Sequence, residues 1–181
     1  CKIPSYIMKN RSNEFTKRYG VTRIDDVTYH YENFIIRYKS TEDRVLQMCN
    51  AVFHLGISST DVNYKLIIDN AHIANHSIYN SIKKLQKTCN LYGSDRNRII
   101  HQHSIMDKDL RKVEFMLNSS RGRNEYSGWA KSRYIKLINE FVEHKAPEME
   151  NNILTLFAGI TNVIEGCKGE YKEKIIMLRN Q

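Results

Sequence analysis

Apolar residues recur every three or four positions along most of the chain, which is the period of an amphipathic α-helix. The first such stretch runs from about Asp26 to Gly56, and the glycine is expected to end the helix. Its apolar stripe consists of Tyr31, Ile35, Tyr38, Val45, Cys49 and Val52, with Phe34, Leu46 and Phe53 beside it. One step of the stripe is taken by Glu42, a carboxylate on the face predicted to be buried.

A second long helix is predicted from about Thr60 or Asp61 to Asn90. Its apolar stripe consists of Ile67, Ala71, Ala74, Ile78, Ile82, Leu85 and Cys89. The small side chains of Ala71 and Ala74 would let it approach the first helix closely. Leu91, Tyr92 and Gly93 are expected to form a turn after it.

The pattern is weaker beyond residue 103. The segment Asp109–Leu117 fits either a helix or a strand, and residues 118–124 read as a loop. Glu125–Lys145 is predicted to be a third amphipathic helix, and Pro147 is expected to open a fourth at its first position. Glu170–Leu178 is predicted to form a last short helix.

The fourth helix has a long apolar stripe, in which Gly166 and Gly169 are expected to mark an end or a kink. The stripe consists of Met149, Ile153, Leu156, Phe157, Ile160, Val163, Ile164 and Cys167. Residues 1–24 are basic, polar and aperiodic, so we interpret them as a tail or linker. Residues 25–181 are then predicted to form one all-α domain.

Composition narrows the class of partner. The formal net charge is +8 and the pI is about 9.3, which favours an anionic partner such as nucleic acid. Cys49, Cys89 and Cys167 lie on apolar stripes, which predicts buried thiols in a reducing cytoplasm. No apolar run reaches about 18 residues, so no membrane-spanning helix is expected. The chain begins with Cys1 rather than Met, which is typical of a fragment or a trimmed chain. An upstream domain or a regulatory partner is therefore left open.

One short stretch gathers the residues with the clearest chemistry. After Gly93, Ser94 and Asp95 are good N-cap residues, so a helix is predicted to begin there. Arg96, Asn97 and Arg98 would lie in its first turn, and His101 and His103 would follow about one turn later. A helix N-terminus attracts anions, arginine binds phosphate in a bidentate manner, and histidine transfers protons near neutral pH.

This stretch resembles the signature of the HEPN superfamily, in which Arg precedes His by four to six residues and is often followed by a polar residue. Arg96-Asn97-Arg98-Ile99-Ile100-His101 has that form, and Arg98 to His103 is a second, less typical frame. The resemblance covers roughly residues 26–168. It implies a HEPN-like bundle with two long antiparallel N-terminal helices, a short motif helix and two or three C-terminal helices.

The resemblance also implies a function. It predicts a metal-independent endoribonuclease of a bacterial toxin or defence type, without a cofactor, whose active site is shared across a homodimer. His101 would move protons, Arg96 with Arg98 would neutralise the phosphoryl oxygens, and Asn97 would position Arg96 or bind the phosphate. RNA would be the substrate, and cleavage would leave a 2′,3′-cyclic phosphate.

Two supporting residues keep alternatives open. In the family, an acidic residue of the first long helix approaches the motif arginine, so Glu42 would orient Arg96 or Arg98. Glu42 could equally pair with its neighbours Lys39 or Arg44. His103 stands where some HEPN toxins carry a tyrosine, and it could be a second proton carrier, a phosphate donor or a surface residue.

Two rival functions remain open at the level of sequence. One is a non-catalytic HEPN-type module that binds nucleotides or RNA or that mediates dimerisation. The other is a helical DNA-binding or scaffold protein whose basic charge is sufficient for its role.

Overall fold

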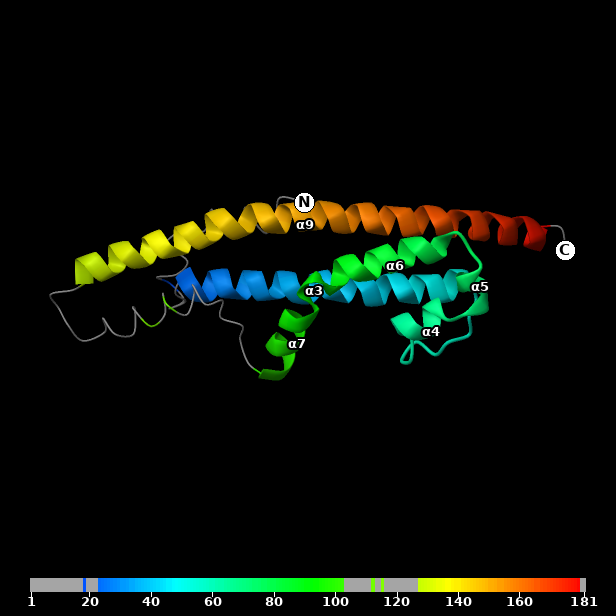
Figure 1. The fold of residues 1–181 in the computed structure, drawn as a ribbon, viewed down its shortest axis with the longest axis horizontal. Coiled ribbons are helices and arrows are strands. Elements are labelled where there is room, and N and C mark those ends of the chain that lie inside the picture. Colours follow the sequence, from blue (N-terminus) through cyan, green and yellow to red (C-terminus); the bar gives the residue numbers. More distant parts are fainter. Residues whose placement is uncertain (1–17, 19–22, 103–111, 113–114, 116–126, 180–181) are drawn as a thin grey trace. The chain divides into compact units, whose positions relative to one another are not determined.

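The computed structural model describes residues 18, 23–102, 112, 115 and 127–179 (Figure 1). Every element within these ranges is a helix, so the predicted all-α class is confirmed. The chain divides into two compact units, which are described separately. Unit 1 comprises Cys1–Ile35 and Asp95–Asn152, and unit 2 comprises Ile36–Ser94 and Ile153–Gln181. Within the described ranges, no helix combines the length and apolar character needed to cross a membrane.

The first predicted helix is present as α3, which spans Arg23–Val52. Asp25 and Asp26 lie in its first turn, where negative charge complements the helix dipole. The predicted stripe is buried except for Val52, which is half-buried, and Ile35 and Cys49 are fully excluded from solvent. The predicted boundary between a tail and the domain stays a prediction, because residues 1–22 other than 18 lie outside the described part of the chain.

α3 ends four residues before Gly56, where the sequence predicted its end. The next residues leave the helix at His54, whose φ of 48° is already left-handed, and Gly56 follows with a φ of 69°. The loop is closed by the side chain of Asn50, whose Nδ2 donates to the Ile57 carbonyl at 2.7 Å. The Ile57 N–H donates back to Asn50 Oδ1 at 3.2 Å.

The prediction that the second helix is one continuous element is wrong. It is divided into α4 (Tyr64–Ile68), α5 (Ala71–Ala74) and α6 (Ile78–Cys89). Each new segment begins where a side chain binds a nearby backbone N–H group in place of a helical carbonyl, and before α6 this is His76 Nδ1, which accepts from the Ile78 N–H at 3.1 Å. Asn63 Oδ1 accepts from the Leu66 N–H, and Asn70 Oδ1 accepts from the His72 N–H, each at 3.0 Å.

The C-terminal division into two or three helices is also wrong, because α9 is continuous from Ser127 to Arg179 and contains Pro147. A proline inside a helix costs about 3 kcal/mol. Each large apolar side chain that is buried contributes about 1.5–3 kcal/mol, so a long buried stripe outweighs that cost. The buried stripe continues through the proline as Val142, Ala146, Met149, Ile153, Leu156, Val163 and Cys167.

In unit 1 the N-terminal part of α3 packs against the first part of α9. The hydroxyl of Tyr134 accepts a hydrogen bond from the Ile24 N–H at 3.1 Å. Two turns further along both helices, Tyr31 meets Phe141 edge to face with ring centroids 5.6 Å apart. Both contacts advance in the same sense along the chain, so the two helices run parallel here.

In unit 2 the helix α6 packs closely against α9 and runs antiparallel to it. A Cβ atom at Gly159 would lie 3.1 Å from Leu85 Cδ1, and one at Gly166 would lie 3.0 Å from Ile78 Cγ1. The predicted close approach to the first helix through Ala71 and Ala74 is wrong, since both alanines are exposed, and the close approach given by these glycines is to α9. Gly166 is a packing residue inside α9, which corrects the prediction that it marks an end or a kink.

The three described cysteines are free and buried, as predicted. Cys49 of α3 and Cys167 of α9 face each other in unit 2. The hydrogen bond with Cys167, together with burial, raises the pKa of Cys49. This thiol is therefore protonated and inert while unit 2 is folded.

Candidate functional site

The motif residues lie on α7, which spans Gly93–Gln102. The helix does not begin at an open N-cap, so the predicted capping by Ser94 and Asp95 is wrong. A 3₁₀ turn, η1, occupies Asn90–Tyr92 directly before it, and the Gly93 N–H donates to the Asn90 carbonyl. Gly93 itself has helical angles, with φ −62° and ψ −44°. Since this N–H is already bonded within the chain, the case for phosphate binding rests on side chains.

The motif side chains differ in exposure. Asn97, Arg98 and His101 are exposed, whereas Arg96 is half-buried. At about 100° per residue, Asn97, Arg98 and His101 fall on one side of α7, and Arg96 lies about 140° from His101. A single copy of α7 therefore groups an imidazole with Arg98 and Asn97, and it turns the guanidinium of Arg96 toward another side.

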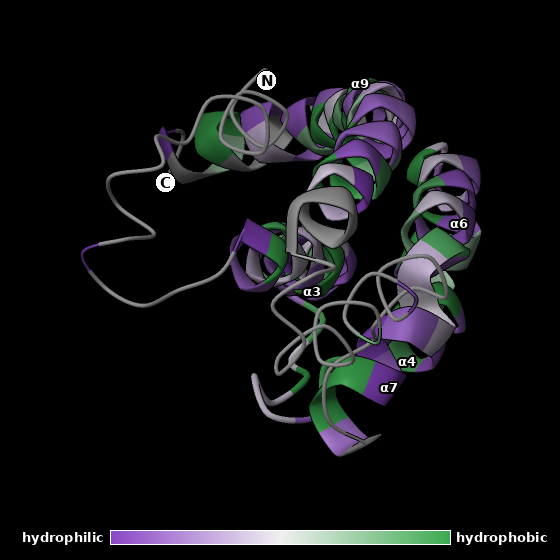
Figure 2. Ribbon diagram, turned by 90° about the vertical axis from the view of Figure 1, so that its left-hand side faces the viewer, coloured by the Kyte–Doolittle hydropathy of each residue, from purple (hydrophilic) through white to green (hydrophobic). Residues whose placement is uncertain are grey.

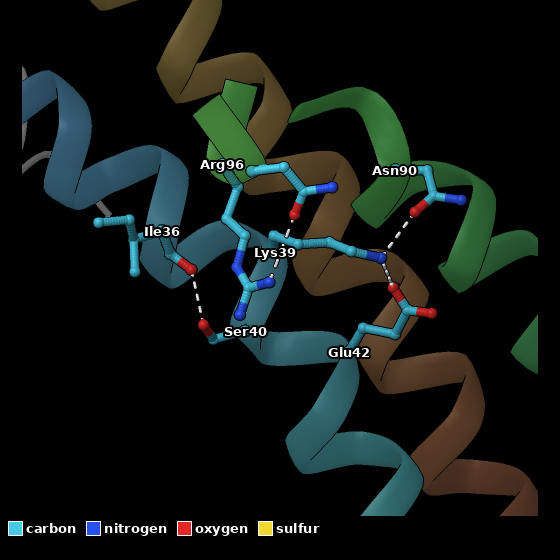
Figure 3. Close-up of polar contacts among 7 residues, drawn as sticks. Ile36, Lys39, Ser40, Glu42, Asn90 and Arg96 are labelled. Carbon is cyan, nitrogen blue, oxygen red and sulfur yellow. Dashed lines mark hydrogen bonds and ion pairs between the residues drawn. The ribbon is translucent and has the colours of Figure 1, made fainter. Parts of the chain in front are cut away.

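Arg96 is linked to the residue that follows it. Its Nη1 donates to Asn97 Oδ1 at 3.5 Å, and both residues belong to unit 1 (Figure 3). Its Nε is buried and has no hydrogen-bond partner among the residues that the structure describes. A guanidinium carries five N–H donors, so Arg96 keeps most of its donor capacity for an anionic group.

His101 lies at the surface, where solvent or a substrate can reach its imidazole. This is the environment that a proton-transferring histidine needs, since the ring must touch the reacting oxygen atoms. His103 falls outside the described residues, and its three possible roles stay open.

Glu42 is buried, with 4% of its surface exposed, and its carboxylate forms a short ion pair with Lys39. Of the two neighbours predicted as partners, Lys39 is the one in contact, because Arg44 donates to Gln47 instead at 3.2 Å. Glu42 belongs to unit 2 and both motif arginines to unit 1. Its role toward Arg96 or Arg98 therefore stays a prediction.

A contact that the sequence did not reveal anchors the segment before α7. Lys39 Nζ, besides pairing with Glu42, donates to Asn90 Oδ1 at 2.6 Å, as Figure 3 shows. Asn90 is the C-cap of α6 and the first residue of η1. Lys39 therefore ties the start of the motif segment to a buried carboxylate of α3.

An aromatic contact supports the same segment. Tyr92, the last residue of η1, is buried and meets Tyr38 of α3 edge to face, with ring centroids 5.1 Å apart. Burial, and to a smaller extent the nearby Cys89, raises the pKa of Tyr38 to about 12. Tyr38 is therefore neutral near pH 7, and its role here is packing rather than proton transfer.

Metal ligation has no support in the part of the chain that the structure describes. No group of three or more His, Cys, Asp or Glu side chains is arranged there to hold an ion. The chemistry available at α7 is that of guanidinium, amide and imidazole groups.

Comparison with known proteins identifies the family. A protein-family model described as Cthe2314-like HEPN matches residues 3–167, a segment that contains α3 to α7 and most of α9. No curated protein and no solved structure gives a significant match. The matched segment includes the complete Arg96–His101 motif and extends over most of the 181 residues. This chain belongs to the HEPN family.

Proposed function

We propose that the protein is a metal-independent endoribonuclease of the HEPN type, with an active site shared between two copies of the chain. The observation that carries the proposal is the Arg96-x4-His101 motif on an exposed helix of a HEPN-family chain. The net charge of +8 also favours a polyanionic substrate.

The chemistry requires only groups present on α7 and in RNA. The 2′-OH of the substrate loses its proton to an imidazole and attacks the adjacent phosphorus. The bond from phosphorus to the 5′-oxygen then breaks, and this oxygen takes a proton from an imidazolium. The products are a 2′,3′-cyclic phosphate and a 5′-OH. His101 is the proton carrier, a role that typically contributes 10²–10⁴-fold in rate.

The arginines stabilise the charge that develops on the phosphoryl oxygens. Arg96 and Arg98 both lie on α7 and carry donors that match the geometry of phosphate. Asn97 accepts from Arg96 Nη1 and holds its guanidinium, leaving other N–H groups for the substrate.

The separation of Arg96 and His101 around α7 argues for a second copy. With about 140° between them, the two side chains leave one helix in different directions, which favours a site built from two helices. Two α7 helices related by a two-fold axis would place the Arg96 of one chain beside the His101 of the other. Such isologous pairing is the commonest geometry of homodimers.

The same separation also fits the alternative, a non-catalytic HEPN module that binds RNA or nucleotides or that mediates dimerisation. In that case the motif would bind without cleaving. A role in bacterial toxin or defence systems applies to the catalytic reading alone, and it rests on the analogy with the family.

A cleavage assay tests the proposal. RNA is incubated with the wild type and with His101→Ala, in the presence and absence of EDTA, and the product ends are identified by mass spectrometry. We expect cleavage that persists in EDTA, leaves cyclic phosphate ends, fails on all-2′-deoxy substrate and falls by at least about 10²-fold in His101→Ala.

Two results would contradict this mechanism. Loss of cleavage in EDTA would point to a metal-dependent reaction. RNA binding without cleavage by the wild type would favour the non-catalytic alternative.

A further inference from the structure

The exposed side of α6 is basic in its C-terminal half. Lys83, Lys84 and Lys87 are all exposed, and their spacing of three and four residues brings them onto one side of the helix. We call these three lysines the α6 basic face. It lies entirely in unit 2 and precedes the motif helix in the chain.

Acidic residues are absent around this face in sequence. The chain has 20 acidic residues in 181, yet Asn70–Ser94 contains none. In the structure as described, none of the three lysines forms an ion pair, whereas Lys136 and Lys168 of α9 pair with Glu140 and Glu165. The charge of the α6 basic face is therefore not neutralised by neighbouring carboxylates.

The neutral residues beside these lysines suit a nucleic acid. Lys83 Nζ lies 5.0 Å from the centre of the Tyr79 ring, which contributes an aromatic surface next to the charges. Asn80, an exposed amide, adds hydrogen-bonding capacity on the same side. Cationic side chains that follow a backbone, with an aromatic ring among them, are typical of surfaces that bind single-stranded nucleic acid.

A lipid surface is the less suitable partner. A helix that binds at a membrane interface needs apolar side chains to insert beneath its basic ones. The large apolar residues of α6 are instead used for packing, since Ile78, Ile82 and Leu85 are each at most 2% exposed. Figure 2 shows hydrophobic and hydrophilic residues on different sides of α6.

We propose that the α6 basic face binds the phosphate backbone of RNA, outside the cleavage motif and without regard to base sequence. The inference rests on the proposed function for the identity of the polyanion. It assigns to Lys83, Lys84 and Lys87 the role of holding substrate, and no role in the chemical step.

The test compares two triple variants that remove the same charge. One carries Lys83→Gln, Lys84→Gln and Lys87→Gln, and the control carries Lys136→Gln, Lys168→Gln and Lys172→Gln, all at exposed positions of α9. Both are built on His101→Ala so that RNA stays intact during the measurement. Binding of a labelled single-stranded RNA of mixed sequence is followed by fluorescence anisotropy over a range of salt concentrations.

We expect the α6 variant to bind RNA at least about tenfold more weakly near physiological salt, and the control to stay close to the parent. The slope of log K against log salt should become shallower by about 2 in the α6 variant, because single strands contribute about 0.7 per phosphate contact. Circular dichroism should show the same helicity for all three proteins, since glutamine and lysine have similar helix propensities.

Four outcomes would overturn the inference. Equal weakening in both variants would mean that net charge alone matters. Unchanged binding in the α6 variant, or no RNA binding by the His101→Ala parent at low salt, would exclude the surface. Binding of the parent to anionic phosphatidylserine vesicles but not to RNA would assign it to lipid. The wild type could also bind RNA through α6 in a salt-dependent manner without cleaving it. That result would support this inference and contradict the proposed nuclease function.

Discussion

At the scale of single residues, the pair of Lys39 and Glu42 is the least ordinary feature of the molecule. A carboxylate with 4% of its surface exposed requires a partner, and Lys39 satisfies it while also binding Asn90. Removing one member leaves the other charge partly buried and unpaired, which costs more than removing both.

A double-mutant cycle measures this coupling. We expect Lys39→Met and Glu42→Gln to be coupled by about 1–3 kcal/mol in the free energy of unfolding, followed by urea denaturation. The matched control is the exposed pair Glu165 and Lys168, changed to Gln and Met, for which a coupling of about 0–1 kcal/mol is expected. Equal coupling in the two cycles would show that burial does not strengthen the Lys39–Glu42 pair.

Sequence reasoning reached part of this residue-level picture. It singled out Glu42 because one polar residue interrupted an apolar period, and it named Lys39 as a candidate partner from their spacing of three. It missed the bond from Lys39 to Asn90, because the two residues are 51 positions apart and only the packing of α3 near α6 brings them together.

At the scale of helices, the periodic stripes predicted α3 well and the continuity of the others poorly. The period of Tyr31, Ile35 and Tyr38 is uninterrupted, so α3 followed from burial alone. The breaks before α6 depend on hydrogen bonds accepted by the side chains of Asn63, Asn70 and His76, which compete locally with the helix. Pro147 gave a strong local signal for a boundary, and the buried stripe on both sides of it overrode that signal.

The glycines of α9 give a prediction at this scale. Gly166→Ala would place a Cβ atom 3.0 Å from Ile78 Cγ1 and 3.3 Å from Ile78 Cβ, so either the helices separate or Ile78 must shift. We expect a net destabilisation of about 1–2 kcal/mol, measured by urea denaturation, because overpacking exceeds the gain in helix propensity.

Gly169 is the matched control, since a Cβ atom there has no neighbour within 4 Å. Gly169→Ala should stabilise the protein by roughly 0.5–1 kcal/mol through helix propensity alone. If the two substitutions changed stability in the same direction, the close approach of α6 to α9 at Gly166 would have no energetic importance.

At the scale of the whole molecule, the proposed function depends on two chains. The sequence identified the motif residues and the family, but neither it nor one copy of the chain brings Arg96 and His101 together. The reason is geometric, because a spacing of five residues on a helix separates side chains by more than a quarter of a turn. The proposed mechanism therefore takes Arg96 from one chain and His101 from the other.

Mixing two inactive variants tests the shared site. Arg96→Ala and His101→Ala should each be nearly inactive alone. After exchange of subunits, about half of the dimers contain both variants, and each of these keeps one Arg96 and one His101 in the shared cleft. We expect partial recovery of RNA cleavage, well above either variant alone.

The control for this experiment replaces one partner with the double variant Arg96→Ala, His101→Ala, which should give no recovery. Light scattering would establish that the chains associate, and co-purification of two differently tagged variants would establish that they exchange. Exchange without recovery, or an active wild type that is monomeric under assay conditions, would contradict a composite active site.

The thiols of Cys49 and Cys167 have a practical consequence for all of these comparisons. Because the thiol of Cys49 is protonated and both thiols are buried, an alkylating reagent can modify the pair only in molecules whose unit 2 has transiently opened. The rate at which iodoacetamide labels this pair under native conditions therefore measures how often unit 2 opens. This rate would distinguish a variant that has lost a catalytic side chain from one whose unit 2 has become less stable.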